Sequence, residues 1–464
     1  MMHTIFKSNN NKLIKAFVFF YLLSALLEKL RWDIFGLGCD LFTMVTAVVF
    51  VLLCASYIMQ KKQFAPGRFE KIIIVYYGLL FAYTLFQFLV IDNDPVIRVQ
   101  YLKGVVTTFV SILVALNVIM IFDLYGKTIN FMTLCRFLLY ASFLNAVYCI
   151  VQRIYPEADA FFVKLFASDT PRYGLDSYGA IGRLTGLFLE SNFNGPFIVM
   201  GIMNCEFLLQ NKSYCTVRSQ KIFVIITLIL SVFACLFTFS LTTYLGIGIF
   251  VLYLLLKSEP RLRKFIFMLV GMVGICIVAI YFIFPSVRNI INAKFHLFSS
   301  VEALTSNSHV VIAIQALQIF SMSFRNVVFG TGINCLNIFY QNVFGYEVMK
   351  AHSYYLQVLC ELGIVGFLLS AFYIYAIFRA AGNKSKEGKY LIGLLAIMLA
   401  MNFTYDPFTR NMSIIFLMFA VALSKNENGS TFSWPSPTEY QKMTGWIRFL
   451  YERTGLNKVI RRKS

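Results

Sequence analysis

The segment 351–366 combines residue types that suit proton transfer at a membrane boundary. It places His352, one of only four histidines in the chain, directly before a long apolar stretch. Histidine is the side chain whose unperturbed pKa lies closest to neutral pH. His352 could therefore act as a general base that takes a proton from a hydroxyl nucleophile. The alternative is an interfacial histidine that is hydrogen-bonded to Tyr354 or Tyr355.

Glu361 follows in the same segment, about two and a half helical turns deeper than His352. We expect its carboxylate to be buried and paired. In this interpretation Glu361 and Tyr355 organise the site and do not react themselves. Gly363 and Gly366, which come next, allow close contact between helices.

A second polar group, made of Arg183, Glu190 and Asn192, lies where another apolar stretch begins. Polar side chains at the edge of a membrane are costly unless they face a cavity or pair with one another. The planar guanidinium of Arg183 suits a phosphate, which it can hold through two parallel hydrogen bonds. We therefore expect Arg183 to bind phosphate, with Glu190 and Asn192 organising the site. The alternative is that Arg183 snorkels to the membrane surface or pairs with Glu190.

Further basic residues fall in the segments that we assign to the same side of the membrane. His309, Arg288 and Arg325 share one long polar segment, and Arg410 follows Asp406 in a short turn. Together they would give this face a positive field that attracts an anionic ligand. Singly, His309, Arg288 and Arg325 are each better explained as solvated loop charges, and Arg410 is equally well explained as the partner of Asp406. The sequence shows no metal-ligand cluster and no nucleotide-binding glycine loop, so we expect no metal and no cofactor.

The composition indicates an integral membrane protein. Of the 464 residues, 59% are hydrophobic and 14% are charged, whereas a soluble domain has about 25% charged residues. The formal net charge of +19 could suggest nucleic-acid binding. Basic residues concentrate in the cytoplasmic loops of membrane proteins, however, and this explains the surplus without a nucleic-acid partner.

We predict an all-α polytopic membrane protein with about twelve transmembrane helices, since a span needs about 20 apolar residues. With both termini cytoplasmic, most lysines and arginines fall in inner segments, as expected for membrane proteins. Residues 1–424 would form the transmembrane domain and 425–464 a cytoplasmic tail. Two long outer segments, about 152–194 and 285–353, would form the site, and the second contains a surface helix near 310–324. The predicted spans are 13–28, 37–59, 71–91, 102–122, 128–151, 192–210, 222–239, 241–257, 265–284, 354–379, 390–405 and 409–424.

Four motifs, in this order, resemble those of the O-antigen polymerase and O-antigen ligase superfamily, the membrane glycosyltransferases of the Wzy and WaaL type. They are Arg183–Asn192, the Ser- and Thr-containing stretch Phe239–Gly246, Phe329–Gly332, and His352–Gly366. The ordered set covers about 180–370, and the predicted number of spans extends the resemblance to the whole chain. One position departs from the family, which usually carries an arginine after serine in the surface helix where this chain has His309.

The resemblance implies a glycosyltransferase at the periplasmic face of the bacterial inner membrane, with a sugar chain on undecaprenyl pyrophosphate as donor. An acceptor hydroxyl attacks the anomeric carbon and the lipid pyrophosphate leaves, without a nucleotide sugar or a metal. By this resemblance Arg183 would bind the pyrophosphate and His352 would activate or position the acceptor hydroxyl. The second phosphate contact would come from His309 or from one of the three other outer arginines named above.

Three functions fit these observations. We favour a polymerase that joins lipid-linked repeat units of O-antigen, capsule or exopolysaccharide. The reason is that the segment Glu190–Asn192 looks more like the corresponding segment of polymerases than that of ligases. An O-antigen ligase that transfers the glycan to lipid A-core is the alternative. A flippase of lipid-linked oligosaccharide is a second alternative, although transporters place polar sites near the midplane and often have two related halves. A polysaccharide chain-length regulator as partner is implied by the resemblance alone.

Overall fold

The computed structural model describes the helical bundle and a hairpin between its first two helices. The described residues are 2–34, 37–90, 95–155, 183–188, 190–211, 216–257, 308–346, 351, 353–382, 385–403 and 410–426, with a few positions between 271 and 292. Over these ranges the strands are β1 (Arg31–Ile34) and β2 (Leu37–Asp40), an antiparallel pair. The remaining regular structure is helical, as the composition predicts.

Eleven of the twelve predicted ranges overlap helices, although residues 37–40 of the predicted span 37–59 form β2, and the twelfth range, 265–284, lies largely outside the described residues. The segment predicted to lie outside the membrane contains three shorter helices, and the first of them confirms the helix expected near 310–324. The long helices are α1 (Met2–Leu26), α2 (Leu41–Gln60), α3 (Arg68–Val90), α4 (Pro95–Tyr125), α5 (Phe131–Ile154), α7 (Ser191–Gln210), α8 (Arg218–Leu236), α9 (Leu241–Lys257), α16 (Tyr354–Ala381), α17 (Lys386–Met401) and α18 (Arg410–Asn426). The shorter helices are α13 (Ser308–Ser321), α14 (Phe324–Phe329) and α15 (Leu336–Phe344).

Six of the described helices are long and apolar enough to cross a membrane, namely α2, α3, α4, α5, α8 and α16. In α2 and α8 only 28% of the most apolar stretch is buried inside the protein. Their outward faces expose large apolar side chains such as Val51 and Ile229. Because water would solvate such continuous faces poorly, the chain is a multi-pass membrane protein. The other six spans stay predictions.

Short polar side chains explain where several helices begin. The Asp40 carboxylate, before α2, accepts a hydrogen bond from the Thr43 backbone N–H at 2.8 Å. The Asn130 side chain accepts one from the Thr133 N–H at 2.9 Å before α5, and Ser385 caps α17 in the same way. Each cap satisfies an amide that has no partner within the first helical turn and stabilises the helix by about 1 kcal/mol.

Helix α18 lies at the centre of the bundle. It contacts α1, α3, α4, α5, α16 and α17, and every side chain from Met412 to Leu423 is buried. A helix that is apolar and buried on all sides belongs to the protein core. Helix α18 therefore packs between two groups of helices. Helices α1, α3, α4 and α5 precede the first predicted outer segment, and α16 and α17 follow the second.

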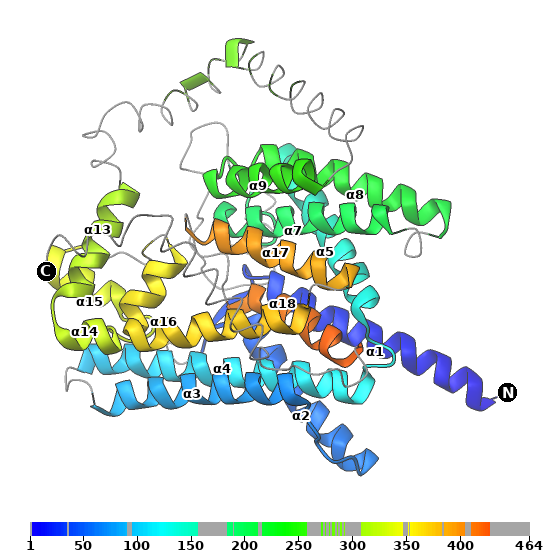
Figure 1. Cartoon of the computed structure of the whole chain (residues 1–464), viewed down its shortest axis with the longest axis horizontal. Coiled ribbons are helices and arrows are strands. Elements are labelled where there is room, and N and C mark those ends of the chain that lie inside the picture. The colour runs from blue at the N-terminus through cyan, green and yellow to red at the C-terminus, as the bar shows by residue number, and fades with distance from the viewer. Residues whose placement is uncertain are drawn as a thin grey trace, which may run out of the picture.

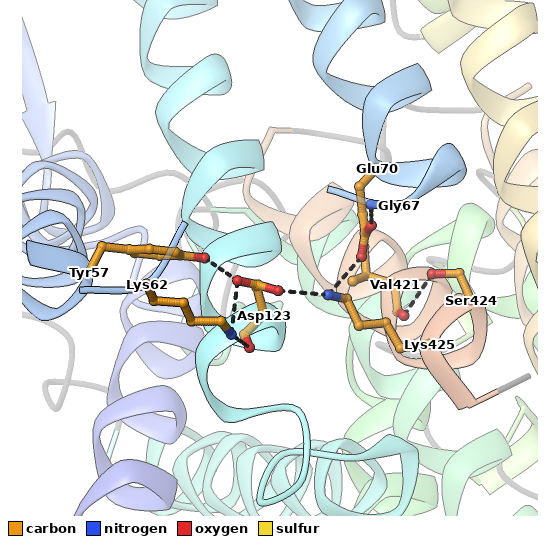
Figure 2. A network of polar contacts seen from close by, with 8 residues as sticks. All are labelled: Tyr57, Lys62, Gly67, Glu70, Asp123, Val421, Ser424 and Lys425. Carbon is orange, nitrogen blue, oxygen red and sulfur yellow. Dashed lines mark hydrogen bonds and ion pairs between the residues drawn. The ribbon is translucent and has the colours of Figure 1, made fainter. Parts of the chain in front are cut away.

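The ends of several helices meet in a charged network at one end of the bundle (Figure 2). Lys425, in α18, pairs with Glu70 at the start of α3 (3.2 Å) and with Asp123 near the end of α4 (3.6 Å). Asp123 also pairs with Lys62 at 3.0 Å and accepts a hydrogen bond from the Tyr57 hydroxyl at 2.6 Å. These residues lie at the end that the sequence assigns to the cytoplasmic side.

The opposite end of the bundle is capped by α13, α14 and α15 (Figure 1). There, Tyr83 and Gln87 of α3 donate hydrogen bonds to the Phe329 carbonyl at 2.7 and 2.6 Å. The part of α3 between Glu70 and Gln87 is about 25 Å long. The charged network and the residues near α14 are therefore separated by nearly the thickness of a hydrocarbon core.

Candidate functional site

Arg183 lies just before α7. It donates hydrogen bonds to a side chain at the start of α7 and to a backbone carbonyl between α8 and α9. Its Nη2 donates to Asn192 Oδ1 at 2.9 Å, and its Nε donates to the Thr238 carbonyl at 3.2 Å. Asn192 Oδ1 also accepts a hydrogen bond from the Ser240 hydroxyl at 2.8 Å. The motif at 183–192 and the motif at 239–246 are thus joined through one amide oxygen.

Three buried amides shape the loop that carries Arg183. Asn145 Oδ1 accepts from the Leu187 N–H at 3.0 Å, and Gln152 Oε1 accepts from the Gly186 N–H at 2.9 Å. Asn194 donates to the Leu184 carbonyl at 3.1 Å and accepts from Asn145 at 2.8 Å. Because these donors and acceptors are satisfied within the protein, the loop is held in one conformation.

Gly186 is required at this turn of the loop. Its φ is +57°, and an added Cβ would lie 2.3 Å from Asn145 Oδ1 and 2.7 Å from Asn194 Oδ1. No larger residue fits between these two amides without moving them. The glycine therefore allows the amides to approach the backbone next to Arg183.

Helix α16 is broken at Gly363, whose φ of 63° and ψ of −168° are non-helical. A break of this kind leaves carbonyl groups of the preceding turn without helical partners. The Thr331 N–H donates to the Cys360 carbonyl, and the Gly332 N–H donates to the Glu361 carbonyl, both at 2.8 Å. The motif at 329–332 therefore lies along the break and supplies hydrogen-bond donors for the free carbonyl groups of the motif at 352–366.

Helix α3 completes the hydrogen bonding of the break. The Tyr83 hydroxyl, which contacts the Phe329 carbonyl, also donates to the Leu362 carbonyl at 2.8 Å. Gln87 donates to Glu361 O at 3.4 Å in addition to its shorter bond to Phe329 O. Two polar side chains inside a membrane span thus find their partners on the freed backbone, as polar groups at this depth require.

The Glu361 carboxylate connects this break to the backbone beside His352. It is 8% exposed, and its Oε1 accepts from the Asn334 N–H at 3.0 Å and from Gln357 Nε2 at 2.6 Å. Gln357 Oε1 in turn accepts from the Ala351 N–H at 2.7 Å. Glu361 is buried and hydrogen-bonded, as the sequence predicts, and Gln357 ties it to the residue that precedes His352.

Helix α17 fixes the chain on the other side of His352. The Ser353 hydroxyl and the Tyr354 N–H both donate to the Asn402 carbonyl, at 3.4 and 3.0 Å. The Tyr355 hydroxyl donates to the Leu399 carbonyl at 2.7 Å. Tyr355 thus anchors the start of α16 to the end of α17.

Two buried side chains next to Glu361 and α13 are kept neutral. Burial and, after it, the charge of Glu361 raise the pKa of the Cys335 thiol. Burial also raises the pKa of the Tyr340 hydroxyl, which donates to the Ile312 carbonyl. Neither side chain is therefore a proton acceptor near neutral pH.

The other predicted site residues are only partly placed. His352 lies outside the described residues, and the side chains of His309 and Arg410 also fall outside them, although the backbones of both belong to helices. Arg288 and Arg325 are exposed. Glu190 occupies the N-cap position of α7 and is half-buried.

Several residues that hold the site were not singled out from the sequence. They are uncharged amides, whereas the residues predicted from the sequence are mostly charged or ionisable. A polar amide within a predicted span is itself a signal, because it must find a partner there. The missed residues are Gln87, Asn145, Gln152 and Gln357.

A known protein family matches the part of the chain that contains three of the four motifs. Residues 226–371 match the Wzy_C family model, described as O-antigen ligase. The matched part contains the motifs at 239–246, 329–332 and 352–366, whereas Arg183 and Asn192 precede it. A comparison with curated proteins gives no match. The segment 226–371 is thus similar to the O-antigen ligase family, which supports the resemblance to the O-antigen polymerase and O-antigen ligase superfamily.

Proposed function

We propose that the protein is a polymerase of O-antigen, capsule or exopolysaccharide that joins repeat units linked to undecaprenyl pyrophosphate. The observation that supports this most is the pairing of the four motifs. Arg183 and Ser240 share Asn192 Oδ1, and the Gly332 N–H binds the broken turn of α16. These bonds join the four motifs in two pairs, 183–192 with 239–246 and 329–332 with 352–366.

In the proposed reaction a hydroxyl of the acceptor sugar attacks the anomeric carbon of the donor. The bond between that carbon and the pyrophosphate oxygen breaks, and its electron pair stays on the leaving oxygen. Arg183 stabilises the charge that develops there through its planar guanidinium. His352 accepts the hydroxyl proton or positions the hydroxyl. We propose that the chemistry needs no metal ion.

Glu361 and Gln357 have a positioning role in this proposal. They connect the Asn334 backbone to the Ala351 backbone by hydrogen bonds of 2.6 to 3.0 Å. A catalytic group must be held within a fraction of an ångström to be effective, and the proposed role of this connection is to hold Ala351, the residue before His352 in the sequence. Arg288, Arg325, Arg410 and His309 remain candidates for a second phosphate contact.

Ligation is the second candidate, and the family description favours it. The matched family is described as O-antigen ligase, and polymerase and ligase share donor and leaving group. They differ in the acceptor, which is another lipid-linked repeat unit or the outer sugars of lipid A-core. No observation favours a flippase.

The decisive assay uses purified protein with undecaprenyl-pyrophosphate-linked repeat units as the only substrate. A ladder of longer chains establishes a polymerase. Transfer that requires lipid A-core establishes a ligase, and no product with either acceptor refutes glycosyl transfer. His352→Ala should abolish product while the amount of folded protein stays normal. Gln341→Ala, at an exposed position of α15, is the matched control and should keep activity.

We also propose that the end carrying Arg183 and Glu361 faces the periplasm and that both termini are cytoplasmic. The support is the charged network of Lys62, Lys425 and their partners at the opposite end. Gln341→Cys and Lys127→Cys place exposed thiols at the two ends. In intact cells with a permeable outer membrane, a membrane-impermeant maleimide should label the first variant only. Labelling of the second alone would reverse the orientation.

A further inference from the structure

Exposed apolar side chains gather around the turn between α13 and α14, although the sequence assigns this segment to the outside of the membrane. Phe324, the first residue of α14, is 83% exposed, and Met322, in the turn before it, is 58% exposed. Ile314 and Leu317 are also exposed and lie three residues apart on one side of α13. A cluster of large exposed apolar side chains marks a contact with a membrane or with another protein.

The hydrogen bonds between α14 and α3 fix the depth at which α14 ends. The Phe329 carbonyl, at the end of α14, accepts from Tyr83 and Gln87 of the membrane-spanning helix α3. Helix α3 continues beyond Gln87 to Val90, an apolar residue that is 63% exposed. Three residues of helix correspond to about 4.5 Å. The end of α14 therefore lies about 4.5 Å below the last apolar residue of α3, at the edge of the hydrocarbon layer.

The length of α14 limits how far Phe324 can lie from that depth. Phe324 and Phe329 are five residues apart in one helix, which is about 7.5 Å along the helix axis. Even with α14 pointing straight out of the membrane, the Phe324 backbone would lie only about 3 Å beyond the level of Val90. The polar headgroup layer on each side of the hydrocarbon core is about 6 Å thick. Phe324 therefore lies within the headgroup layer or deeper.

The lipid-facing surface of α3 continues onto α14. Phe86 is 43% exposed and lies about two turns beyond Leu79, which is also exposed. Exposed apolar side chains on a membrane-spanning helix face lipid. The ring centre of Phe86 is 5.8 Å from that of Phe329, so α14 borders this lipid-facing surface. This continuity favours lipid over a second protein as the partner of the turn.

A basic side chain accompanies the apolar ones. Arg325 is exposed and directly follows Phe324. At a membrane interface, apolar side chains enter the acyl-chain region, whereas the long side chain of an arginine extends towards the lipid phosphates. Both kinds of side chain are present in the turn, at the depth where acyl chains and phosphates meet.

We infer that the turn 322–325 is a membrane-interface anchor that binds phospholipid. Met322 and Phe324 insert among the acyl chains, and Arg325 binds the phosphates of the headgroups. The anchor holds α13, α14 and α15 against the membrane surface. This inference concerns lipid binding and does not depend on the proposed glycosyl transfer. It leaves Arg288, Arg410 and His309 as candidates for the second contact to the donor pyrophosphate.

Tryptophan quenching in phospholipid vesicles tests the depth of the turn. In Phe324→Trp, phospholipid with brominated acyl chains should quench the added fluorescence about as strongly as in Phe86→Trp, on the lipid-facing side of α3. Acrylamide, which stays in water, should quench it weakly. The wild-type protein supplies the background of its three native tryptophans. Gln341→Trp, at an exposed position of α15, is the matched control and should be quenched by acrylamide but not by brominated lipid.

Two outcomes would overturn the inference. Quenching of Phe324→Trp by acrylamide alone, as in Gln341→Trp, would place the turn in water. Weak quenching by both reagents would mean that another protein or a second copy of the chain covers it. If Phe324→Trp does not fold, Met322→Trp gives the same test with the same supporting and refuting results. Arg325→Gln should leave the binding of inorganic pyrophosphate to the purified protein unchanged, and a loss of binding would contradict the role of Arg325 at the headgroups.

Discussion

The break of α16 at Gly363 allows the effect of one substitution to be worked out. Gly363→Ala would put a Cβ 2.3 Å from the Val328 carbonyl oxygen and 2.5 Å from its carbon. Its φ of 63° and ψ of −168° cost a side-chain-bearing residue about 1 to 3 kcal/mol. Moving α14 away would weaken the bonds of Thr331 and Gly332 to α16, each worth about 0.5 to 1.5 kcal/mol.

These contributions give a total destabilisation of about 2 to 6 kcal/mol for Gly363→Ala. Thermal unfolding of the purified protein in detergent measures it, and Gly78→Ala provides the matched control. Gly78 lies on an exposed face of α3, with nothing within 4 Å of the added Cβ, so its substitution should keep or slightly raise the melting temperature. Equal melting temperatures for Gly363→Ala and wild type would refute the structural reasoning. Transfer activity should fall in parallel, because the same backbone positions Glu361.

Three other substitutions test separate parts of the structure. Arg183→Lys should reduce transfer nearly as severely as Arg183→Ala, by about 100-fold or more, because lysine lacks the planar fork. Gln357→Leu should lower kcat about tenfold or more with little change in KM, because it removes the hydrogen bonds that join Glu361 to the Ala351 backbone, next to His352 in the sequence. Glu70→Gln should destabilise the protein by about 1 to 3 kcal/mol, less than for a fully buried pair, because the Lys425 side chain is 28% exposed.

Matched measurements decide each of these cases. Full transfer activity in Arg183→Lys would contradict the guanidinium role, and the amount of folded protein serves as its control. A rise in KM alone for Gln357→Leu would assign the residue to substrate binding. Lys71→Gln, at an exposed position beside Glu70, should not change the melting temperature. An equal change in Lys71→Gln and Glu70→Gln would mean that the network of Figure 2 does not stabilise the fold.

The class of protein and most of the helix positions follow from residue composition and the pattern of apolar stretches. Apolar stretches of about 20 residues are a local property, so the ranges of α3, α5 and α8 follow from residue type alone. The order of the four motifs likewise indicated the superfamily. Arg183 and Glu361 were identified because charged side chains stand out within apolar surroundings, where they are costly.

Which polar groups contact one another depends on how the helices pack. Asn192 joins Arg183 to Ser240, and Lys29 donates a hydrogen bond to Thr185. Both contacts form only because helices that are far apart in the chain pack together. The break at Gly363 depends on donors from α3 and α14, which satisfy carbonyl groups that the sequence of α16 alone leaves unpaired. The physical reason is that hydrophobic pattern fixes which segments enter the membrane, whereas buried polar groups find their partners only when the helices pack.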